Sequence, residues 1–180
     1  MQPFSSRLTY SFITETDLED LYELDQDPAV MKYLNGGRAT SMEEKKTIFL
    51  PRMAKFSNVE KGWGLWKVTT RDTNEFIGWI LVRPMHFFNE EKSTEWHNLE
   101  LGWRFKQASW GKGYATEAAQ ALVNEIKKQP DYTHISAIAL KENAASVNIM
   151  KKLGMAFIEE YLHKDPLGDI PAVYYEKKIA

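Results

Sequence analysis

Hydrophobic and polar positions divide the chain into an early part with helical spacing and a later part with the alternation of strands. Apolar and polar residues alternate over 7–12, which predicts a first strand. Residues 16–19 (Thr-Asp-Leu-Glu) have the form of a capping box ahead of apolar residues at helical spacing, and residues 41–44 (Ser-Met-Glu-Glu) repeat that form. We therefore expect two helical stretches, the second running to about Pro51 and resuming beyond it, with a turn at 35–37 between them.

From Gly64 onwards the pattern is typical of strands. Two expected strands, 65–70 and 76–83, flank the polar connection 71–75, which suits a hairpin. A third strand is expected over 98–105. The apolar side chains that share one face of this third strand are Leu99, Leu101, Trp103 and Phe105.

A strongly periodic helix is expected next, because apolar residues recur there at offsets of three and four. They are Ala115, Ala118, Ala119, Leu122, Val123 and Ile126. Pro130 ends this helix. The remaining elements alternate, and are expected at 134–140 (strand), 145–153 (helix, stopped by Gly154), 156–163 and 172–179 (strands). This order predicts a mixed α+β layered fold.

Length, charge and cysteine content restrict the class of protein. The 180 residues suit a single domain over 1–180, and a formal charge of −2 gives no general attraction to nucleic acid or to an anionic membrane. With no cysteine, disulfides, thiolate zinc sites and cysteine nucleophiles are excluded. No apolar run approaches about 18 residues, and the N-terminus lacks the apolar stretch of a signal peptide. A cytoplasmic protein is therefore expected.

The segment Trp110-Gly111-Lys112-Gly113 carries the clearest chemical signal. Glycines one residue apart let the backbone bend sharply and approach a ligand. The helix that follows begins with unpaired N–H groups, which suit a phosphate or pyrophosphate. The spacing does not fit a P-loop, because no glycine stands five residues before Gly111 and because Gly113, not Ser or Thr, follows Lys112. It does not fit a dinucleotide fingerprint, because Thr116 stands where a third glycine would be. A tight turn without a ligand is the alternative interpretation.

Two separated motifs resemble those of the GNAT N-acetyltransferases, and more closely the branch typified by the ribosomal-protein N-terminal (RimJ/RimL-type) enzymes. The first is Glu100-Leu-Gly-Trp103 followed by the segment 110–118. The second is Asn143-Ala-Ala-Ser146 followed by Leu-Gly-Met at 153–155. The resemblance extends from about residue 7 to residue 179. It implies a GNAT-like fold, in which helices flank a central, mostly antiparallel twisted sheet of about six to seven strands.

The same resemblance implies acetyl-coenzyme A as the cosubstrate, with its pyrophosphate held by the backbone of 106–115. The family signature Arg/Gln-x-x-Gly-x-Gly/Ala falls on Trp110, Gly113 and Ala115, so the first position departs from it. Asn143 would contact the pantetheine or orient the thioester. Lys112 would add charge at the phosphates or remain a solvated loop lysine. The cofactor-binding residues implied are Trp103, Arg104, Phe105, Trp110, Gly111, Lys112, Gly113, Tyr114, Ala115 and Asn143.

The reaction implied is direct attack of a primary amine on the acetyl thioester through a tetrahedral intermediate. The attacking amine must be neutral, although an α-amino group titrates near ~8 and a lysine near ~10.4. Glu100 is the candidate base, because it points away from the apolar face of its strand; a solvated carboxylate or an anchor for the amine are the alternatives. A backbone N–H at about 103–105 would stabilise the oxyanion.

The general acid is less clearly indicated. Many family members place a tyrosine in the helix after the asparagine, but alignment on Gly154 puts Met150 at that position. Ser146 resembles the residue with this role in the ribosomal branch, and a capping role at the helix start is its alternative. Tyr114 is a weaker candidate donor. The implied catalytic residues are therefore Glu100, Ser146 and Asn143.

The acceptor is left open between a protein N-terminal α-amine and a small amine such as a polyamine, an amino acid or an aminoglycoside. Segments 35–38 and 85–92 are its expected walls, Trp63 and Trp66 are either core or pocket, and the acidic residues at 90, 91 and 95 would attract a cation. No metal site is expected, because the histidines lack ligand spacing. A monomer or a homodimer is expected. A coenzyme A-binding module without catalysis is the alternative function.

Overall fold

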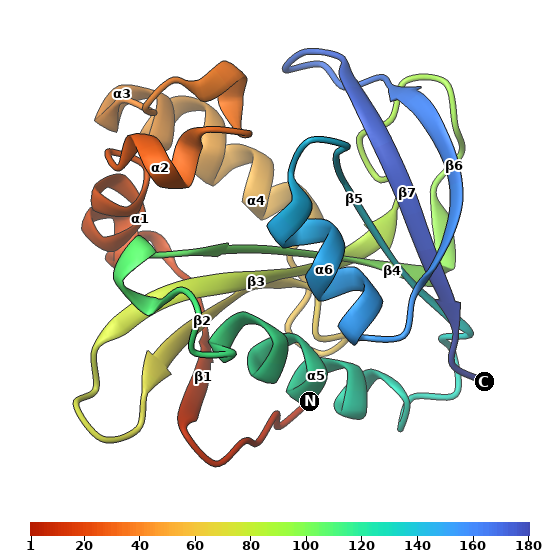
Figure 1. Cartoon of the computed structure of the whole chain (residues 1–180), viewed down its shortest axis with the longest axis horizontal. Coiled ribbons are helices and arrows are strands. Elements are labelled where there is room, and N and C mark those ends of the chain that lie inside the picture. The colour runs from red at the N-terminus through yellow and green to blue at the C-terminus, as the bar shows by residue number, and fades with distance from the viewer.

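The computed structural model describes residues 1–180 and contains one seven-stranded sheet in the order β1-β2-β3-β4-β5-β7-β6 (Figure 1). All neighbouring strands are antiparallel except β4 and β5, which are parallel. The expected mostly antiparallel sheet is confirmed. The strands are β1 (Leu8–Phe12), β2 (Gly64–Thr70), β3 (Phe76–Met85), β4 (Glu95–Phe105), β5 (His134–Leu140), β6 (Ala156–His163) and β7 (Ile170–Lys178).

Helices cover both faces of this sheet. In Figure 1, α1, α2 and α3 gather at the upper left and α4 runs from there towards the centre, whereas α5 crosses the lower part of the view. Successive residues of β2 show the two faces: Leu65 packs in a core with α1, α2 and α4, whereas Trp66 packs in the larger core with α5 and α6. Trp63 also lies in that larger core. The helices are α1 (Leu18–Leu24), α2 (Pro28–Met31), α3 (Met42–Glu44), α4 (Leu50–Phe56), α5 (Tyr114–Ile126) and α6 (Ala144–Lys152).

The two capping boxes have different outcomes. The box predicted at 41–44 is confirmed, because Ser41 Oγ accepts from Glu44 N and the Glu44 carboxylate accepts from Ser41 N. The one predicted at 16–19 is wrong: the box lies two residues earlier, where Asp17 accepts from Thr14 N at 2.9 Å. A one-turn 3-10 helix, Glu15–Asp17, precedes α1, so the chain turns into the helix before the predicted position.

Other boundaries differ by a few residues. The helix predicted to stop at about Pro51 continues from α3 through a π-helical turn, Lys45–Phe49, into α4, whose second residue is Pro51. Helix α5 ends at Ile126, before Pro130, and β4 begins three residues earlier than predicted. None of the helices is long and apolar enough to cross a membrane.

A buried ion triad joins the π-helical turn and α1 to β4. Asp25, which follows α1, binds Arg104 of β4 at 2.7 Å and also binds Lys45. Asp25 and Lys45 are fully buried. Burial alone raises the pKa of the Asp25 carboxyl, but Arg104 and Lys45 outweigh it and hold that pKa below its usual value. Asp25 therefore remains ionised, and its charge offsets the two buried cations.

We expect Asp25→Asn to lower the free energy of unfolding by about 3–5 kcal/mol, because it leaves two buried cations without a counter-charge. Urea unfolding at neutral pH measures this loss, with Lys164→Gln in an exposed ion pair as the control that should cost less than about 1 kcal/mol. Because the folded pKa is lowered, the wild-type advantage should shrink as the pH falls below the usual aspartate value near ~3.9. If Asp25→Asn has the same free energy of unfolding as the wild type at neutral pH, Asp25 does not balance the charges of Lys45 and Arg104.

Candidate active site

Strands β4 and β5 diverge after a short pairing, and this leaves a wedge-shaped gap in the sheet. Only 98–100 of β4 pair with 134–136 of β5. Beyond Glu100, β4 stays paired with β3 as far as Phe105, whereas β5 stays paired with β7. The second halves of β4 and β5 therefore face one another without a shared ladder.

The backbone of β4 presents unpaired groups to this gap. Lys106 N donates to Ile77 O at 2.8 Å, which orients the even-numbered peptide groups of β4 towards β3. Between Leu99 and Phe105 the β3–β4 register is regular, so the odd-numbered groups point the other way. The Trp103 N–H consequently faces the gap where β5 no longer pairs. Such a donor is available to a ligand or a developing oxyanion.

A glycine loop and the first turn of α5 lie just beyond the end of β4. Gly111 and Gly113 have φ of 73° and 77°, the left-handed region that favours glycine. Gly113 is the N-cap of α5 and provides no side chain for its N–H groups. Arg7 supports the loop, because Nη1 donates to Lys112 O at 2.9 Å and Nε donates to Glu117 at 2.6 Å. The free N–H groups and the positive end of the helix suit an anion.

Helix α6 begins on the opposite side of the gap. Its N-cap, Asn143, accepts from Ser146 N at 3.2 Å. Trp103 Nε1 donates to Ser146 Oγ at 3.0 Å, which joins β4 to α6. Met150 is fully buried in the core and carries no proton to donate. A hollow of about 560 Å³ beside α6 is lined by Lys141, Ala144, Ala145, Val147, Asn148 and Lys151.

Glu100 lies on the other face of the sheet, at the point where β4 and β5 separate. Its Oε2 accepts from Arg83 Nε at 2.7 Å, and its side chain is 7% exposed. Burial, followed by the charge of Glu100, raises the pKa of the Tyr161 hydroxyl, and burial lowers the pKa of His163. Tyr161 OH and His163 Nδ1 are 2.9 Å apart. At neutral pH both side chains are therefore uncharged.

The structure thus brings most of the predicted residues to one place. Trp103, Asn143 and Ser146 meet at the gap, Glu100 lies behind it, and the loop 110–115 follows the end of β4. Arg104 differs, because its guanidinium binds Asp25 on the Glu100 face of the sheet.

Sequence analysis missed Arg83, Tyr161 and His163. The hairpin register of β3 and β4 would have placed Arg83 opposite Glu100. No local pattern marks the two β6 residues, which come close to Glu100 only through the β7–β6 pairing.

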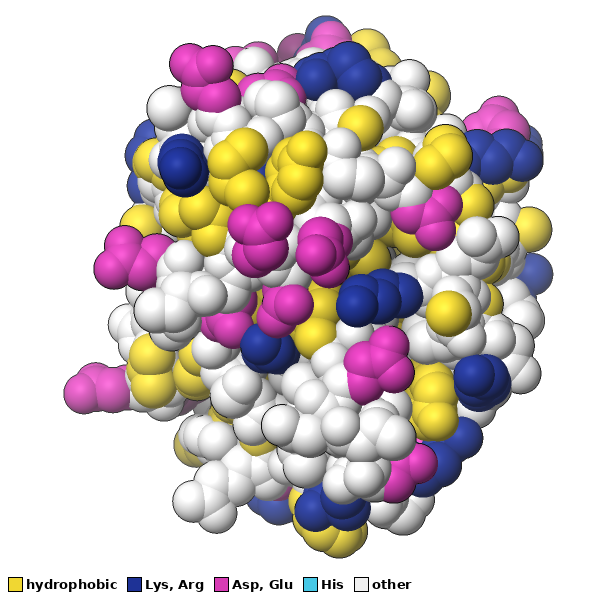
Figure 2. Space-filling model, turned by 90° about the vertical axis from the view of Figure 1, so that its left-hand side faces the viewer, with side chains coloured by type: hydrophobic (Ala, Val, Ile, Leu, Met, Phe, Trp, Pro, Cys, Tyr) yellow, Lys and Arg dark blue, Asp and Glu magenta, His cyan; other side chains and the backbone are white.

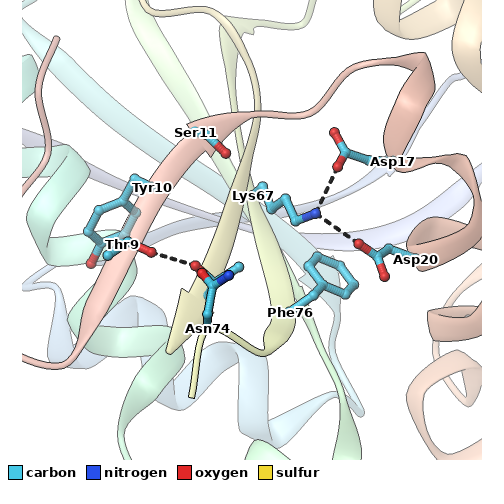
Figure 3. A pocket seen from close by; sticks show the side chains of 9 residues that line it. Thr9, Tyr10, Ser11, Asp17, Asp20, Lys67, Asn74 and Phe76 are labelled. Carbon is cyan, nitrogen blue, oxygen red and sulfur yellow. Dashed lines mark hydrogen bonds and ion pairs between the residues drawn. The ribbon is translucent and has the colours of Figure 1, made fainter. Parts of the chain in front are cut away.

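A second hollow, of about 460 Å³, lies at the β1–β2 edge of the sheet (Figure 3). Lys67 Nζ lies between Asp17 and Asp20 at 2.7 and 2.8 Å, and Thr9 bonds to Thr69. Figure 2 shows the left-hand side of Figure 1, where acidic, basic and hydrophobic side chains are intermixed. The charged groups of this hollow therefore neutralise one another in part, and they do not single out a ligand. No group of three or more His, Asp or Glu side chains is arranged to hold a metal ion.

The arrangement at the gap fits two substrates that meet in the sheet. A phosphate-bearing molecule would place its phosphates on the glycine loop and extend along the unpaired edge of β4. A second molecule would approach from the Glu100 face. The N–H of Trp103 and the hydroxyl of Ser146 would act on a carbonyl or a leaving group between them.

Comparisons with known proteins agree with this geometry. The sequence model of the acetyltransferase (GNAT) domain matches residues 7–156. The uncharacterized N-acetyltransferase YnaD of Bacillus subtilis is 34% identical over 139 residues, which are 77% of this chain and 73% of that protein. An acetyltransferase (GNAT family) structure from Bacillus anthracis is 26% identical, with a TM-score of 0.76 over 99% of this chain and 98% of that one.

Two further structures share the fold at lower identity. Aminoglycoside acetyltransferase AAC(6')-Ib, solved with ribostamycin and coenzyme A, has a TM-score of 0.77 at 21% identity, over 96% of this chain and 94% of that one. RimL, the ribosomal L7/L12 α-N-protein acetyltransferase, solved with coenzyme A, has a TM-score of 0.74 at 16% identity, over 98% and 97%.

We expect Gly113→Ala to destabilise the glycine loop, because an alanine in the left-handed region costs about 1–2 kcal/mol. For a chain of this size, 1 kcal/mol lowers the Tm by roughly 2–4 °C, which thermal unfolding detects. Gly113→Asn is the matched variant and should lose less, since asparagine tolerates this conformation. If alanine and asparagine leave the Tm unchanged, the loop does not hold this conformation in solution.

Proposed function

The chain belongs to the acetyltransferase (GNAT) family, and we propose how its residues transfer an acetyl group to a primary amine. It is an acetyl-coenzyme A-dependent N-acetyltransferase. The observation that supports the proposed site is the gap between β4 and β5, with Trp103 and Ser146 joined across it and Glu100 behind it. The acceptor and the roles of these residues are the proposal.

The cosubstrate would be held mainly by backbone groups. The N–H groups of the loop 106–115 and of the first turn of α5 would bind the pyrophosphate. The unpaired edge of β4 would bind the pantetheine arm, as a strand would. Asn143 fixes the start of α6 beside this path. Lys112, in the loop itself, would add positive charge near the phosphates.

Glu100 is proposed as the proton acceptor on the acceptor side. The amine must lose a proton before or during attack, since α-amino groups titrate near ~8. Arg83 holds Oε2 of Glu100, which leaves Oε1 to face the amine. As the new C–N bond forms at the thioester carbonyl, the Trp103 N–H would donate to the oxyanion. Tyr161 and His163 would surround the incoming amine with uncharged groups.

Ser146 is proposed as the donor to the departing sulfur. Its Oγ already accepts a hydrogen bond from Trp103 Nε1, so its own hydrogen is free to point elsewhere. The C–S bond breaks, and the thiolate takes this proton. A simple thiol has a pKa near ~8.5, so the thiolate needs only modest help to leave near neutral pH. This supports turnover despite the methionine at position 150.

Positioned catalytic candidates argue against the alternative of a coenzyme A-binding module without catalysis. A module that only binds would not require Glu100 to be held by Arg83, or Ser146 to be held by Trp103 and Asn143. Neighbours of the same fold include an aminoglycoside enzyme and RimL, which acts on a protein N-terminus. Both kinds of acceptor carry amines, so we propose a primary amine as the acceptor.

We expect acetyl-coenzyme A to raise the Tm of the protein, whereas ATP and NAD should leave it unchanged. A ligand at about 100 times its dissociation constant stabilises a fold by roughly 2.7 kcal/mol. Thermal unfolding with each compound in parallel measures this, and thiol release against a panel of amines then measures turnover. Equal shifts with ATP would mean that the loop is a general phosphate site. A shift without turnover on any amine would favour the binding module.

We expect Glu100→Gln to reduce kcat by about 10²–10⁴-fold, the usual contribution of a general base. Ser146→Ala should reduce kcat roughly tenfold, because its proton is less essential to the leaving thiolate. In both variants the thermal shift with acetyl-coenzyme A should persist. Ser11→Ala, on an exposed position of β1, is the control and should keep full activity. Unchanged kcat in Glu100→Gln would assign Glu100 to structure alone.

A further inference from the structure

Two arginines from separate elements converge on one aromatic ring near Glu100. Arg52 of α4 places its guanidinium carbon 3.8 Å from the centre of the Phe88 ring, and Arg83 of β3 places its own at 5.3 Å. Arg83 also lies 5.5 Å from the ring of Phe56. These rings form an apolar surface beside the two charges. The acceptor side of the site is therefore both aromatic and cationic.

Most of the hydrogen-bond donors of these arginines have no acceptor in the protein. A guanidinium carries five N–H groups. Arg83 uses one, from Nε to Glu100, and Arg52 uses one, from Nη2 to Asp165 of the β6–β7 turn. The two side chains are only 12% and 19% exposed, yet none of their other nitrogens is sealed from solvent. Such donors are available to a planar oxyanion, which arginine binds in a bidentate manner.

Three acidic groups around the two arginines are paired with cations, whereas Glu95 and Glu176 are hydrogen-bonded to the neutral side chains of Asn98 and Tyr174. Glu100 binds Arg83, Asp165 binds Arg52, and Glu159 binds Lys92 at 2.6 Å. His163, 3.9 Å from Asp165, is held uncharged by burial, which lowers its pKa. A polyamine or an aminoglycoside would have to compete with Arg83, Arg52 and Lys92 for these three carboxylates. An acceptor with its own negative charge would find free donors.

We propose that the acceptor is a small molecule that carries a carboxylate beside its primary amine, as an α-amino acid does. This rests on the proposed function. The amine would lie by Glu100, and the carboxylate would bind the free N–H groups of Arg52 and Arg83. Glu100 and Arg83 are themselves in contact, at 2.7 Å. A zwitterion can therefore lie against the pair with its ammonium group beside Glu100 and its carboxylate beside Arg83. Phe56 and Phe88 would contact its side chain.

The transfer step balances without any further reactant. The ammonium group of the acceptor loses one proton to solvent before attack and a second to Glu100 as the C–N bond forms, and the C–S bond of acetyl-coenzyme A breaks. The thiolate takes the proton of Ser146, which recovers one from solvent, and Glu100 releases its proton to solvent. The products are an N-acetyl amino acid, coenzyme A and one proton. The carboxylate of the acceptor takes no part in bond making, and its only role is to bind the arginines.

The first experiment compares free amino acids with their amides as acceptors of the wild-type enzyme. An amide keeps the amine and the side chain but lacks the carboxylate. We expect its kcat/KM to be at least tenfold lower, although its amine is less basic and so more often neutral. Spermidine, an aminoglycoside and a short peptide complete the panel. Equal kcat/KM for amino acids and amides, or a preference for any of the other three, would overturn the proposal.

The second experiment separates binding by Arg52 from its ion pair with Asp165. We expect Arg52→Met to raise KM for amino acids about 10- to 100-fold, while KM for acetyl-coenzyme A and rates with amides stay unchanged. Arg52→Lys should recover part of the loss. Asp165→Asn removes the same ion pair but leaves the guanidinium, so it should keep or lower KM for amino acids. A loss in Asp165→Asn equal to that in Arg52→Met would show a structural role only.

Arg71→Gln is the matched control, because Arg71 also lies near a phenylalanine ring, that of Phe4, at the opposite edge of the sheet. It should not change KM for any acceptor. Thermal unfolding of each variant shows that the fold is retained. If acetyl-coenzyme A binds but no amine is acetylated, the proposed function fails, whereas acetylation of amides as fast as amino acids refutes only the inference on the acceptor.

Discussion

The divergence of β4 from β5 is the constraint on which the site depends. A sheet normally pairs every backbone N–H and C=O, and a strand in its middle has none to spare. Here β5 leaves β4 after Glu100, so the second half of β4 has one partner strand instead of two. The open edge lies in the middle of the sheet, and two helix starts border it. The proposed cosubstrate pocket is therefore a consequence of strand geometry more than of any single side chain.

The side chains of β4 alternate between the two faces of the sheet, and the residues on each face have a different role. Leu99, Leu101 and Phe105 anchor the strand to the core under α5 and α6. Glu100 and Arg104, on the other face, contact groups from the helical and hairpin segments. The Asp25–Lys45–Arg104 triad joins the end of α1 and the π-helical turn to β4. It thereby connects the helices on the proposed acceptor side to the strand that borders the proposed cosubstrate side.

Much of this could be predicted from the sequence, because periodicity and glycine placement are local signals. The strands, the α5 stripe and the direction of Glu100 all followed from residues within about ten positions of one another. The capping box predicted at 16–19 was wrong because both Thr14 and Thr16 can serve as an N-cap, and only the path of the chain selects Thr14. The ion pair of Arg52 with Asp165 joins residues that are 113 positions apart, and no pattern in either segment indicates the other.

The two faces of β4 also differ in how readily they can change during evolution. The proposed cosubstrate side relies on glycines whose φ values few residues adopt, so substitution of these glycines strains the loop. It also relies on backbone groups, which are unchanged when other side chains there are replaced. The acceptor side relies on side chains of α4, β3 and the β6–β7 turn, each of which can be replaced without altering the gap. One scaffold can therefore retain its donor of acetyl groups while successive lineages acquire new acceptors.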